Sequence, residues 1–544
     1  MSDVPRDGQR VVAVTGGGGG IGAAIAEELG RQGAFVVTMD PLVTLDGSEQ
    51  LPAREETTAG RIVAAGGSAR ATTISVTDAA AVADLFADLP RLDAVINVAG
   101  ISRPTSFAKG TEDDWRDVVA VHLDGYLNVL AGALPVMAAA GHGRILGVTS
   151  GSGWRPADTG AYGCAKRAVA ALTWQLGGAV PEGVVVNAMS PIAVTRMVTA
   201  ALARVPASGS SGGSAATGGL SLGSMPQPEE LGPLGAHLVG EDLSWCSGHV
   251  VFAGGSEVAV VEPPRLLEVV RTSDARSLPD LIDAVVPVAL APAESAQAST
   301  GASNPRFDAT VDAPRGARGA PAVGSCAIVS DRPAVASALV AALSARAITT
   351  HAVPVADDFA AAGAALDAAG PVDAVVVALA GAPAAAGAPW ERILAEHAGI
   401  AHGIHADAAW TRAAADRART TSRPMRVVTL TDATTAGGRS RAQAVAQHAR
   451  SSRRATRDGV AAFAVSVESA QDHDLTAAAE LAGHLLGAGE GPELAGAELV
   501  VGAGWLGLRG HPRAATSFAL GGSAIPRWFD DALREAIGAP EGGR

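Results

Sequence analysis

The sequence predicts an α/β protein in which two doubly wound parallel-sheet domains follow one another in tandem. Apolar runs of strand length alternate with segments of helical periodicity, which is the pattern of a parallel sheet covered by helices on both faces. The order of these runs repeats in the second half of the chain. With 544 residues, the chain is also longer than a single domain of ~100–200 residues.

The first expected strand, 11–15, leads into a glycine-rich loop. Glycines fill 16–20 and position 22, and 23–29 has the pattern of a helix start. Glycine lets the backbone approach a pyrophosphate closely, and a helix N-terminus supplies free N–H groups and the positive end of a dipole. A strand before such a loop and a helix after it predict a Rossmann-like, dinucleotide-binding domain.

The next expected strand, 35–39, ends at an acidic residue, Asp40. An acid at this place hydrogen-bonds the ribose hydroxyls of the adenosine and repels a 2′-phosphate. Asp40 therefore predicts NAD rather than NADP as the cofactor.

Tyr162 and Lys166 are the candidate catalytic pair. The chain contains two tyrosines, and its only lysines are Lys109 and Lys166, so chance rarely places one of each four residues apart. On a helix, residues i and i+4 share a face. A nearby cation lowers the pKa of a phenol below its ordinary ~10, so the phenol can exchange a proton with an alcohol near neutral pH.

Five motifs within residues 10–262 resemble, in order, those of the short-chain dehydrogenase/reductase family. The glycine loop matches its cofactor signature, an N-x-A-G motif follows the fourth expected strand, and the tyrosine–lysine pair has the family's spacing. The residues expected to bind the cofactor, Asp40 included, are Thr15, Gly16, Gly20, Ile21, Gly22, Asp40, Val76, Asn97, Ala99, Gly100, Tyr162, Lys166, Pro191 and Thr195.

The resemblance also implies a catalytic serine, Ser150, which would hydrogen-bond the substrate oxygen. Tyr162 would then take the hydroxyl proton during oxidation, and Lys166 would lower the pKa of the phenol and bind the ribose. His122 stands where many relatives carry an asparagine that holds a proton-relaying water. A relay role and a packing role for His122 both stay open.

Within the family, the segments around Asn97 and His122 resemble the (3R)-hydroxyacyl-CoA dehydrogenase unit of type-2 multifunctional enzymes. This implies NAD-dependent interconversion of a secondary alcohol and a ketone, on a 3-hydroxyacyl thioester or a steroid-like hydrophobic alcohol. Two alternatives stay open. One is an NADPH-dependent biosynthetic ketoreductase that acts on a carrier-bound chain, and the other is a non-catalytic scaffold with a dinucleotide-binding fold.

Composition limits the remaining functions. The net charge of −14 disfavours a nucleic-acid partner. No apolar run reaches the ~18 residues of a membrane helix, and the first residues lack a targeting pattern, so we expect a cytoplasmic protein with no membrane partner. The three cysteines, Cys164, Cys246 and Cys326, are too scattered for a disulfide framework or a metal site.

Composition also suggests domain boundaries. We expect a catalytic domain over 1–275, an Ala/Pro/Ser-rich linker over 276–323, a second Rossmann-like domain over 324–525 and a C-terminal tail over 526–544. A Gly/Ser-rich stretch over 205–227 stands where the family has its substrate-covering loop.

The second domain should be catalytically silent. Ser330, Asp331 and Arg332 replace its glycine loop, and no tyrosine or lysine follows Lys166. The residues at the serine, tyrosine and lysine positions are Asp432, Ala444 and His448, and we expect His448 to be a solvated helix residue.

Family members usually pair through long helices of neighbouring subunits, so the tandem fusion would place that pairing within one chain. A strand-rich edge over 498–504 would add a second contact. Because family members pair in this way, we also expect a homo-oligomer, a dimer of tandem chains.

Overall fold

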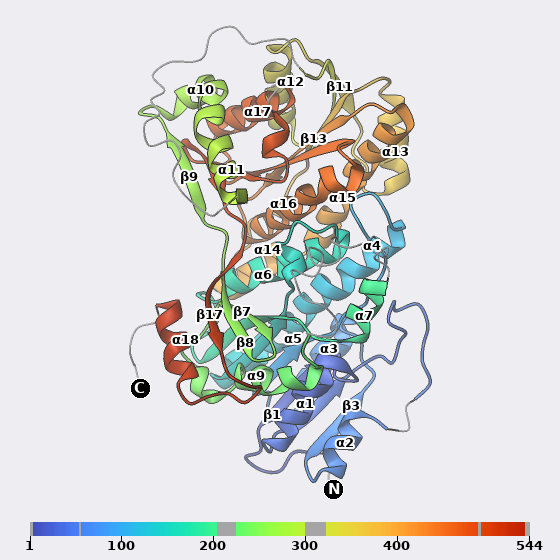
Figure 1. Ribbon diagram of the computed structural model, residues 1–544, viewed down its shortest axis with the longest axis vertical. Coiled ribbons are helices and arrows are strands. Elements are labelled where there is room, and N and C mark those ends of the chain that lie inside the picture. The colour runs from blue at the N-terminus through green and yellow to red at the C-terminus, as the bar shows by residue number, and fades with distance from the viewer. Residues whose placement is uncertain (1–3, 54–55, 204–224, 300–321, 488–490, 539–544) are drawn as a thin grey trace.

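The computed structural model describes residues 4–53, 56–203, 225–299, 322–487 and 491–538. These residues form two α/β units stacked along the long axis of the molecule (Figure 1). Each unit is a mostly parallel sheet with helices on both faces. The predicted fold class, two Rossmann-like units in tandem, is confirmed.

Among the described residues, the first sheet has nine strands in the order β17-β8-β7-β6-β5-β4-β1-β2-β3. The strands from β3 to β7 run parallel, and β8 pairs antiparallel with both β7 and β17. Their bounds are β1 (Val11–Thr15), β2 (Phe35–Met39), β3 (Ser68–Thr72), β4 (Ala94–Asn97), β5 (Gly143–Val148), β6 (Val184–Pro191), β7 (Val250–Gly254), β8 (Glu257–Glu262) and β17 (Arg513–Ala519).

Helices cover both faces of the first sheet. The outer face carries α1 (Gly20–Arg31), α2 (Thr58–Ala64), α9 (Gly232–His237) and α18 (Phe529–Ile537), whose apolar side chains share one core with the sheet. The inner face, toward the second unit, carries α3 (Ala79–Ala87), α4 (Glu112–Val119), α5 (Gly125–Ala140) and α6 (Gly160–Leu176). A short helix, α7 (Arg196–Ala203), follows β6.

The second sheet has eight strands among the described residues, in the order β11-β10-β12-β13-β14-β15-β16-β9. β10, β12, β13 and β15 stand in the places that β1, β4, β5 and β7 hold in the first sheet, as the repeated sequence runs predict. Their bounds are β9 (Leu266–Arg271), β10 (Ser325–Ser330), β11 (Thr349–Val353), β12 (Ala374–Ala378), β13 (Met425–Asp432), β14 (Val460–Val467), β15 (Glu498–Gly502) and β16 (Trp505–Arg509).

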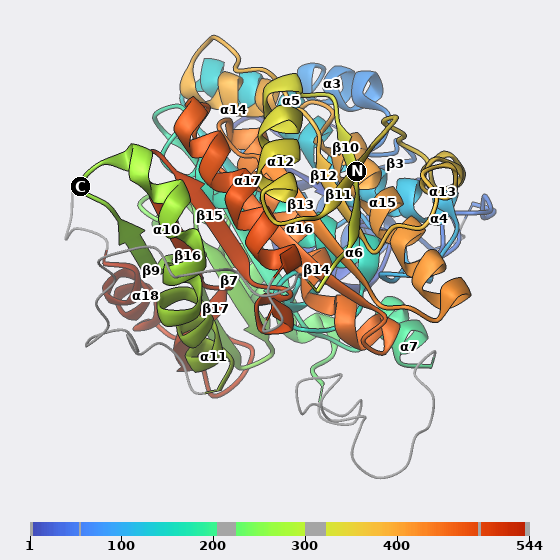
Figure 2. The ribbon, with the colours of Figure 1, turned by 90° about the horizontal axis from the view of Figure 1, so that it is seen from above.

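The second sheet is also covered on both faces. Seen from above, α12 and α17 lie over its outer face (Figure 2), and α15 and α16 lie on the face toward the first unit. The helices are α10 (Leu278–Val285), α11 (Ala291–Ser299), α12 (Pro333–Ser344), α13 (Phe359–Ala368), α14 (Pro389–His397), α15 (Ile400–Thr421), α16 (Ala436–Thr456) and α17 (Asp472–Gly487).

The two units exchange strands, which corrects the expected domain boundaries. The chain leaves β8 and places β9 beside β16 in the second sheet, and it leaves β16 and returns β17 to the edge of β8 (Figure 1). Each crossing strand covers an edge that would otherwise expose unpaired backbone groups. The residues expected to form a tail also include α18, where Phe529 and Leu533 are buried against the first unit.

The first part of the expected linker is helical rather than loose. α10 and α11, joined by a π-helical turn over Val286–Leu290, pack on the core of the second unit. Leu278, Ile282 and Val285 recur at helical spacing and are buried there, as is Leu290 at the end of the π-helical turn. Residues 300–321 of that linker lie outside the described residues, as does the expected substrate-covering loop apart from 225–227.

The units meet through their long inner helices. α6 packs against α16, α4 against α15, and α5 against α14, and one apolar core contains side chains from both units. The expected helix pairing within one chain is therefore present. The segment 498–504 is not a free sheet edge, because β15 is paired with β14 and β16 on its two sides. Its first residue nevertheless adds a second contact between the units, since Glu498 forms an ion pair with Arg167 of α6 at 3.1 Å.

One helix has a composition that membrane spans share. The continuous helix Glu112–Ala140, formed by α4, a π-helical turn and α5, is long and apolar enough to cross a membrane. Here it packs between the first sheet and the second unit, where Val129, Leu130 and Leu134 are fully buried.

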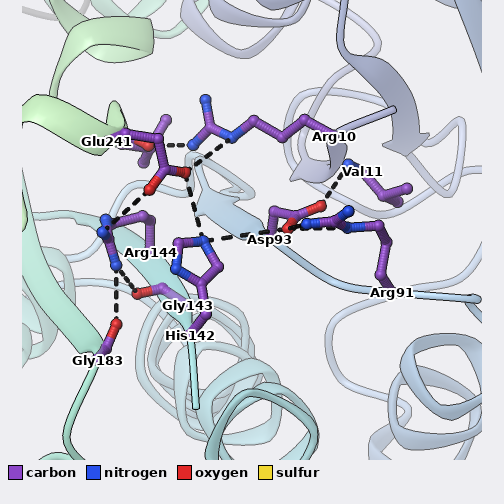
Figure 3. A network of polar contacts seen from close by, with 10 residues as sticks. Arg10, Val11, Arg91, Asp93, His142, Gly143, Arg144, Gly183 and Glu241 are labelled. Carbon is purple, nitrogen blue, oxygen red and sulfur yellow. Dashed lines mark hydrogen bonds and ion pairs between the residues drawn. The ribbon is translucent and has the colours of Figure 1, made fainter. Parts of the chain in front are cut away.

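A polar network fixes the amino ends of the central strands β1, β4 and β5 (Figure 3). Asp93 accepts a hydrogen bond from the Val11 N–H at 2.7 Å and pairs with Arg91. Glu241 lies 3.2 Å from Arg144 and 3.8 Å from Arg10. Fixing these ends sets the mutual register of the strands, and their opposite, carboxyl ends form the site described next.

Candidate active site

The glycine loop after β1 is held so closely that larger residues would clash. A Cβ at Gly16 would lie 2.8 Å from the backbone nitrogen of Ala99, and the φ of Gly16 is +65°. A Cβ at Gly22 would lie 2.3 Å from the carbonyl oxygen of Gly16. Thr15 joins this loop to the next strand, because its hydroxyl donates to Asn97 Oδ1 at 2.8 Å.

Asp40 lies against this loop. Its Oδ2 accepts the Gly18 N–H at 3.1 Å, and its Oδ1 accepts the Leu42 N–H at 2.9 Å. A Cβ at Gly18 would lie 2.2 Å from Oδ2. The carboxylate is thus fixed beside the glycine backbone, at the end of β2.

The segment after β6 lies over the same loop. Thr195 caps α7, since its hydroxyl accepts the Val198 N–H at 3.2 Å, and its methyl group is 3.8 Å from the Cβ position of Gly20. Arg196 places Nη2 3.5 Å from the Cβ position of Gly19. This guanidinium is not among the residues predicted from the sequence, although Arg196 directly follows a predicted cofactor residue.

The predicted cofactor residues therefore gather at one edge of the first sheet, beyond the carboxyl ends of β1, β2, β4 and β6. Val76 is buried at this edge, and its carbonyl oxygen accepts a hydrogen bond from the side chain of Asn128. A glycine backbone without room for a Cβ, the N-terminus of α1, a carboxylate and a guanidinium fit the pyrophosphate and ribose of a nicotinamide dinucleotide.

The catalytic candidates lie beyond β5 at the same edge. Ser150 begins a 3₁₀ turn, Gly151–Gly153, and its Oγ accepts the Ser152 N–H at 3.2 Å. Tyr162 lies in the first turn of α6 and hydrogen-bonds Ser150. Lys166, one turn further, donates to the Val148 carbonyl oxygen at 2.6 Å.

Burial controls the acid–base properties of this pair. Burial raises the pKa of Tyr162 above 10.0, and the hydrogen bond with Ser150 opposes that rise. Burial lowers the pKa of Lys166 to about 7. The sequence predicts that Lys166 lowers the pKa of the phenol, but in this structure it does not. Its ammonium group is 5.8 Å from the centroid of the Tyr162 ring and binds a carbonyl oxygen instead.

His122 occupies the π-helical turn Ala120–Asp124 between α4 and α5. Its ring meets Tyr162 edge-on at 5.0 Å between centroids, and its Nε2 lies 2.9 Å from the Ile101 carbonyl oxygen. Burial, reinforced by Lys166, lowers its pKa to about 3, so the ring is neutral. Nδ1 is buried without a hydrogen-bond partner among the described residues. The ring packs beside the Tyr162 phenol, and its part in a proton relay stays a prediction.

The corresponding edge of the second unit is filled by its own side chains. Arg332 forms an ion pair with Asp432 at 3.3 Å, and Asp331 accepts the Ala380 N–H at 2.7 Å. β13 ends at Asp432 and α16 begins at Ala436, so the long turn that carries Ser150 in the first unit has no counterpart.

Two predicted positions of the second unit lie at the interface between the units. Ala444 is fully buried there. His448 is not solvated, contrary to expectation. Its ring stacks on Phe107 at 4.5 Å between centroids, and its Nε2 bonds the Thr411 hydroxyl at 2.7 Å. Helical periodicity alone does not show that this face of α16 meets another unit.

Comparisons with known proteins agree with this site. Residues 10–205 match the family model for short chain dehydrogenase. The short-chain reductase protein NovJ of Streptomyces niveus is 31% identical over 45% of this chain and 93% of its own length. Peroxisomal multifunctional enzyme type 2 of Drosophila melanogaster is 37% identical over 26% of this chain and 24% of that protein.

One solved structure covers both units. The N-domain of a bacterial malonyl-CoA reductase, solved with NADP, aligns with 91% of this chain and 97% of its own length. The TM-score is 0.65 at 17% sequence identity, so the likeness concerns the fold, with both units in tandem.

The chain belongs to the short-chain dehydrogenase/reductase family. It is an NAD(P)-dependent oxidoreductase that acts on hydroxyl or keto groups, and the family motifs lie in its N-terminal half.

Proposed function

We propose that this protein is an NAD-dependent dehydrogenase of hydrophobic secondary alcohols, with a 3-hydroxyacyl thioester or a steroid-like alcohol as substrate. The observation that carries the proposal is a single edge of the first sheet. It brings the Ser150–Tyr162 hydrogen bond and Lys166 together with a glycine loop bounded by Asp40.

In the proposed mechanism, the Ser150 hydroxyl donates a hydrogen bond to the substrate oxygen and fixes the carbinol against the phenol. Tyr162 then removes the hydroxyl proton as a general base. A bound nicotinamide supplies the hydride acceptor. Lys166, whose pKa burial lowers to about 7, would stabilise the phenolate only while it is protonated, and it would also bind the ribose of the dinucleotide. In the reverse direction Tyr162 donates the proton and a ketone is reduced.

The choice of NAD rests on Asp40. Its carboxylate is fixed by two backbone N–H groups, from Gly18 and Leu42, at the end of β2. A fixed negative charge there accepts hydrogen bonds from ribose hydroxyls and repels a 2′-phosphate.

The substrate class rests on likeness to relatives. The segments around Asn97 and His122 resemble the hydroxyacyl-CoA dehydrogenase unit, and peroxisomal multifunctional enzyme type 2 is among the similar proteins. NovJ, a short-chain reductase, represents the alternative direction of reaction.

The test is a steady-state assay with NAD and with NADP against 3-hydroxyacyl thioesters of increasing length and a set of hydroxysteroids, following the absorbance of the reduced nicotinamide. A hydrophilic polyol with secondary hydroxyls is the control substrate. We expect turnover with NAD that improves with substrate hydrophobicity. A preference for NADP, or turnover of the polyol alone, would contradict the proposal.

A further inference from the structure

α16 of the second unit lies against the turn that carries Ser150. Gln447 on α16 is buried and points into this turn. Its side-chain nitrogen Nε2 lies 2.9 Å from the Ser152 carbonyl oxygen and 2.9 Å from the Arg155 carbonyl oxygen. A residue of the second unit thus binds the backbone within the 3₁₀ turn, at Ser152, and just after it, at Arg155.

The orientation of the Gln447 amide follows from its partners. Both are carbonyl oxygens, which only accept hydrogen bonds, so the NH₂ group and not the oxygen must face them. The two amide hydrogens match the two acceptors. Oε1 is buried and has no hydrogen-bond partner within the described part of the chain. The NH₂ group therefore makes the hydrogen bonds that hold this side chain in place.

Ser152 connects Gln447 to the catalytic serine directly. Its carbonyl oxygen accepts from Gln447, and its N–H donates to Ser150 Oγ at 3.2 Å. The turn is also pressed against α6, because a Cβ at Gly163, next to Tyr162, would lie 2.9 Å from the Ser152 carbonyl oxygen and 3.4 Å from Gln447 Cγ.

We propose that Gln447 is a positioning residue for the active site of the first unit: it holds the turn of Ser150 over Tyr162 from the opposite half of the chain. The inference rests on the proposed function, in which Ser150 and Tyr162 act on the substrate. It assigns a role in catalysis to the unit that the sequence predicts to be catalytically silent.

The competing explanation for a loss of activity in a Gln447 variant is a general weakening of the interface between the units. Another residue of α16 provides a matched control for this effect. Ser440 is on the same helix and is fully buried. Its hydroxyl accepts a hydrogen bond from Gln175 of α6 at 2.9 Å and also bonds Nε2 of His397 on α14 at 2.8 Å, and neither partner touches the serine turn. Gln175 lies at the far end of α6 from Tyr162. Ser440→Ala therefore removes a contact between the same two helices without touching the serine turn.

The experiment compares Gln447→Met, which keeps the volume and removes both donors, with Ser440→Ala in the full-length chain. The substrate is whichever alcohol the wild type oxidises fastest. Misplacing a catalytic group by about 1 Å costs up to ~10²-fold, so we expect Gln447→Met to lower kcat about 10–100-fold with the Kd for the dinucleotide unchanged. Ser440→Ala should keep at least half of kcat.

Two further measurements separate positioning from instability. Loss of the Ser150 hydrogen bond raises the pKa of Tyr162, so the alkaline limb of the pH–rate profile should move to higher pH in Gln447→Met and stay in place in Ser440→Ala. Hydrogen exchange should also become faster over 151–156 in Gln447→Met alone, and this measurement needs no turnover.

Equal kcat in Gln447→Met and the wild type, or an equal loss in both variants, would overturn the proposal. If Gln447→Met does not fold, Gln447→Asn, which withdraws the amide by one methylene, takes its place with the same expectations. A wild type without alcohol oxidation would remove the proposed function, whereas unchanged exchange over 151–156 would remove the positioning role.

Discussion

Tyr162 is partly buried between Ser150 and the edge of the His122 ring, and its proton affinity reflects this environment. Burial disfavours the phenolate and raises the pKa, and the hydrogen bond with Ser150 favours the phenolate and lowers it. For oxidation the active form is the phenolate. The oxidation rate should therefore rise with pH into the alkaline range, toward the raised pKa of the phenol.

Tyr162→Phe should reduce turnover by ~10²–10⁴-fold, since it removes the proton acceptor. Dinucleotide binding, measured by calorimetry, should stay nearly intact because the glycine loop and Asp40 are unchanged. Tyr126, the second tyrosine, is fully buried in the core. Tyr126→Phe controls for loss of a buried hydroxyl and should keep its activity. A Tyr162→Phe variant with more than about a tenth of wild-type kcat would exclude the assigned role.

Asp40→Ala should narrow the preference for NAD over NADP, measured as the ratio of kcat/KM for the two cofactors. The change removes a ribose acceptor and a charge that repels the 2′-phosphate. Asp46 is the matched control, because its carboxylate binds Thr44 and Ser48 within the next loop rather than the glycine loop. Asp46→Ala should leave the ratio unchanged, and a wild type that already prefers NADP would refute the assignment.

At the scale of elements, the pairing of α6 with α16 joins the two units. Arg167, next to Lys166, is fully buried and forms an ion pair with Glu498 of β15 at 3.1 Å. Gln443 of α16 accepts a hydrogen bond from its Nε at 2.9 Å. Removing one partner of a buried ion pair leaves an uncompensated charge and destabilises strongly. α6, the helix that carries Tyr162 and Lys166, is therefore anchored in the second unit at several points along its length.

His448 on α16 should make stability depend on pH. Burial lowers its pKa to about 3 in the folded protein, and Arg412 adds to this. From its ordinary pKa of 6.5 down to about 3, the unfolded chain binds a proton that the folded chain does not. The free energy of unfolding should thus fall as the pH drops below about 6.5.

His448→Gln cannot take up that proton and keeps a group able to bond Thr411. Thermal melts between about pH 7 and pH 5 should show a smaller loss of Tm in the variant than in the wild type. If Tm falls equally with pH in the two proteins, His448 is protonated in the folded state as readily as in the unfolded one.

At the scale of the whole molecule, the exchange of β9 and β17 makes the two units depend on one another. A chain that ends at Leu281 would lose β17 and α18, and it would expose the apolar faces of α4, α5 and α6. We expect this truncated protein to aggregate, to change its oligomeric state or to lose activity, as shown by size-exclusion chromatography and the alcohol assay. A soluble, fully active product in the same assembly state would refute the dependence.

The second unit should bind no dinucleotide. The Arg332–Asp432 ion pair and the Asp331–Ala380 hydrogen bond fill the edge where a pyrophosphate would lie. Calorimetric titration with NAD should therefore give one site per chain, and Asp40→Ala should weaken that single site. Two sites per chain would contradict the prediction.

Much of the fold could be predicted because parallel sheets leave a strong local pattern. The runs at 11–15, 94–97 and 143–148 are apolar because both faces of these strands are covered by helices. The same holds for the repeated runs in the second half, so the tandem order was visible. The helices over 278–290 also had a signal, the helical spacing of Leu278, Ile282 and Val285, which the surrounding Ala, Pro and Ser residues masked.

By itself, the sequence determined the glycine loop, the acid that ends β2 and the tyrosine–lysine spacing, because each depends on neighbours within a few residues. Only the tertiary structure decided what lies between the units. The burial of His448, the crossing of β9 and β17, and the hydrogen bonds of Gln447 to Ser152 and Arg155 join residues far apart in the chain. Such contacts depend on which helix faces meet after folding, and no local pattern records that choice.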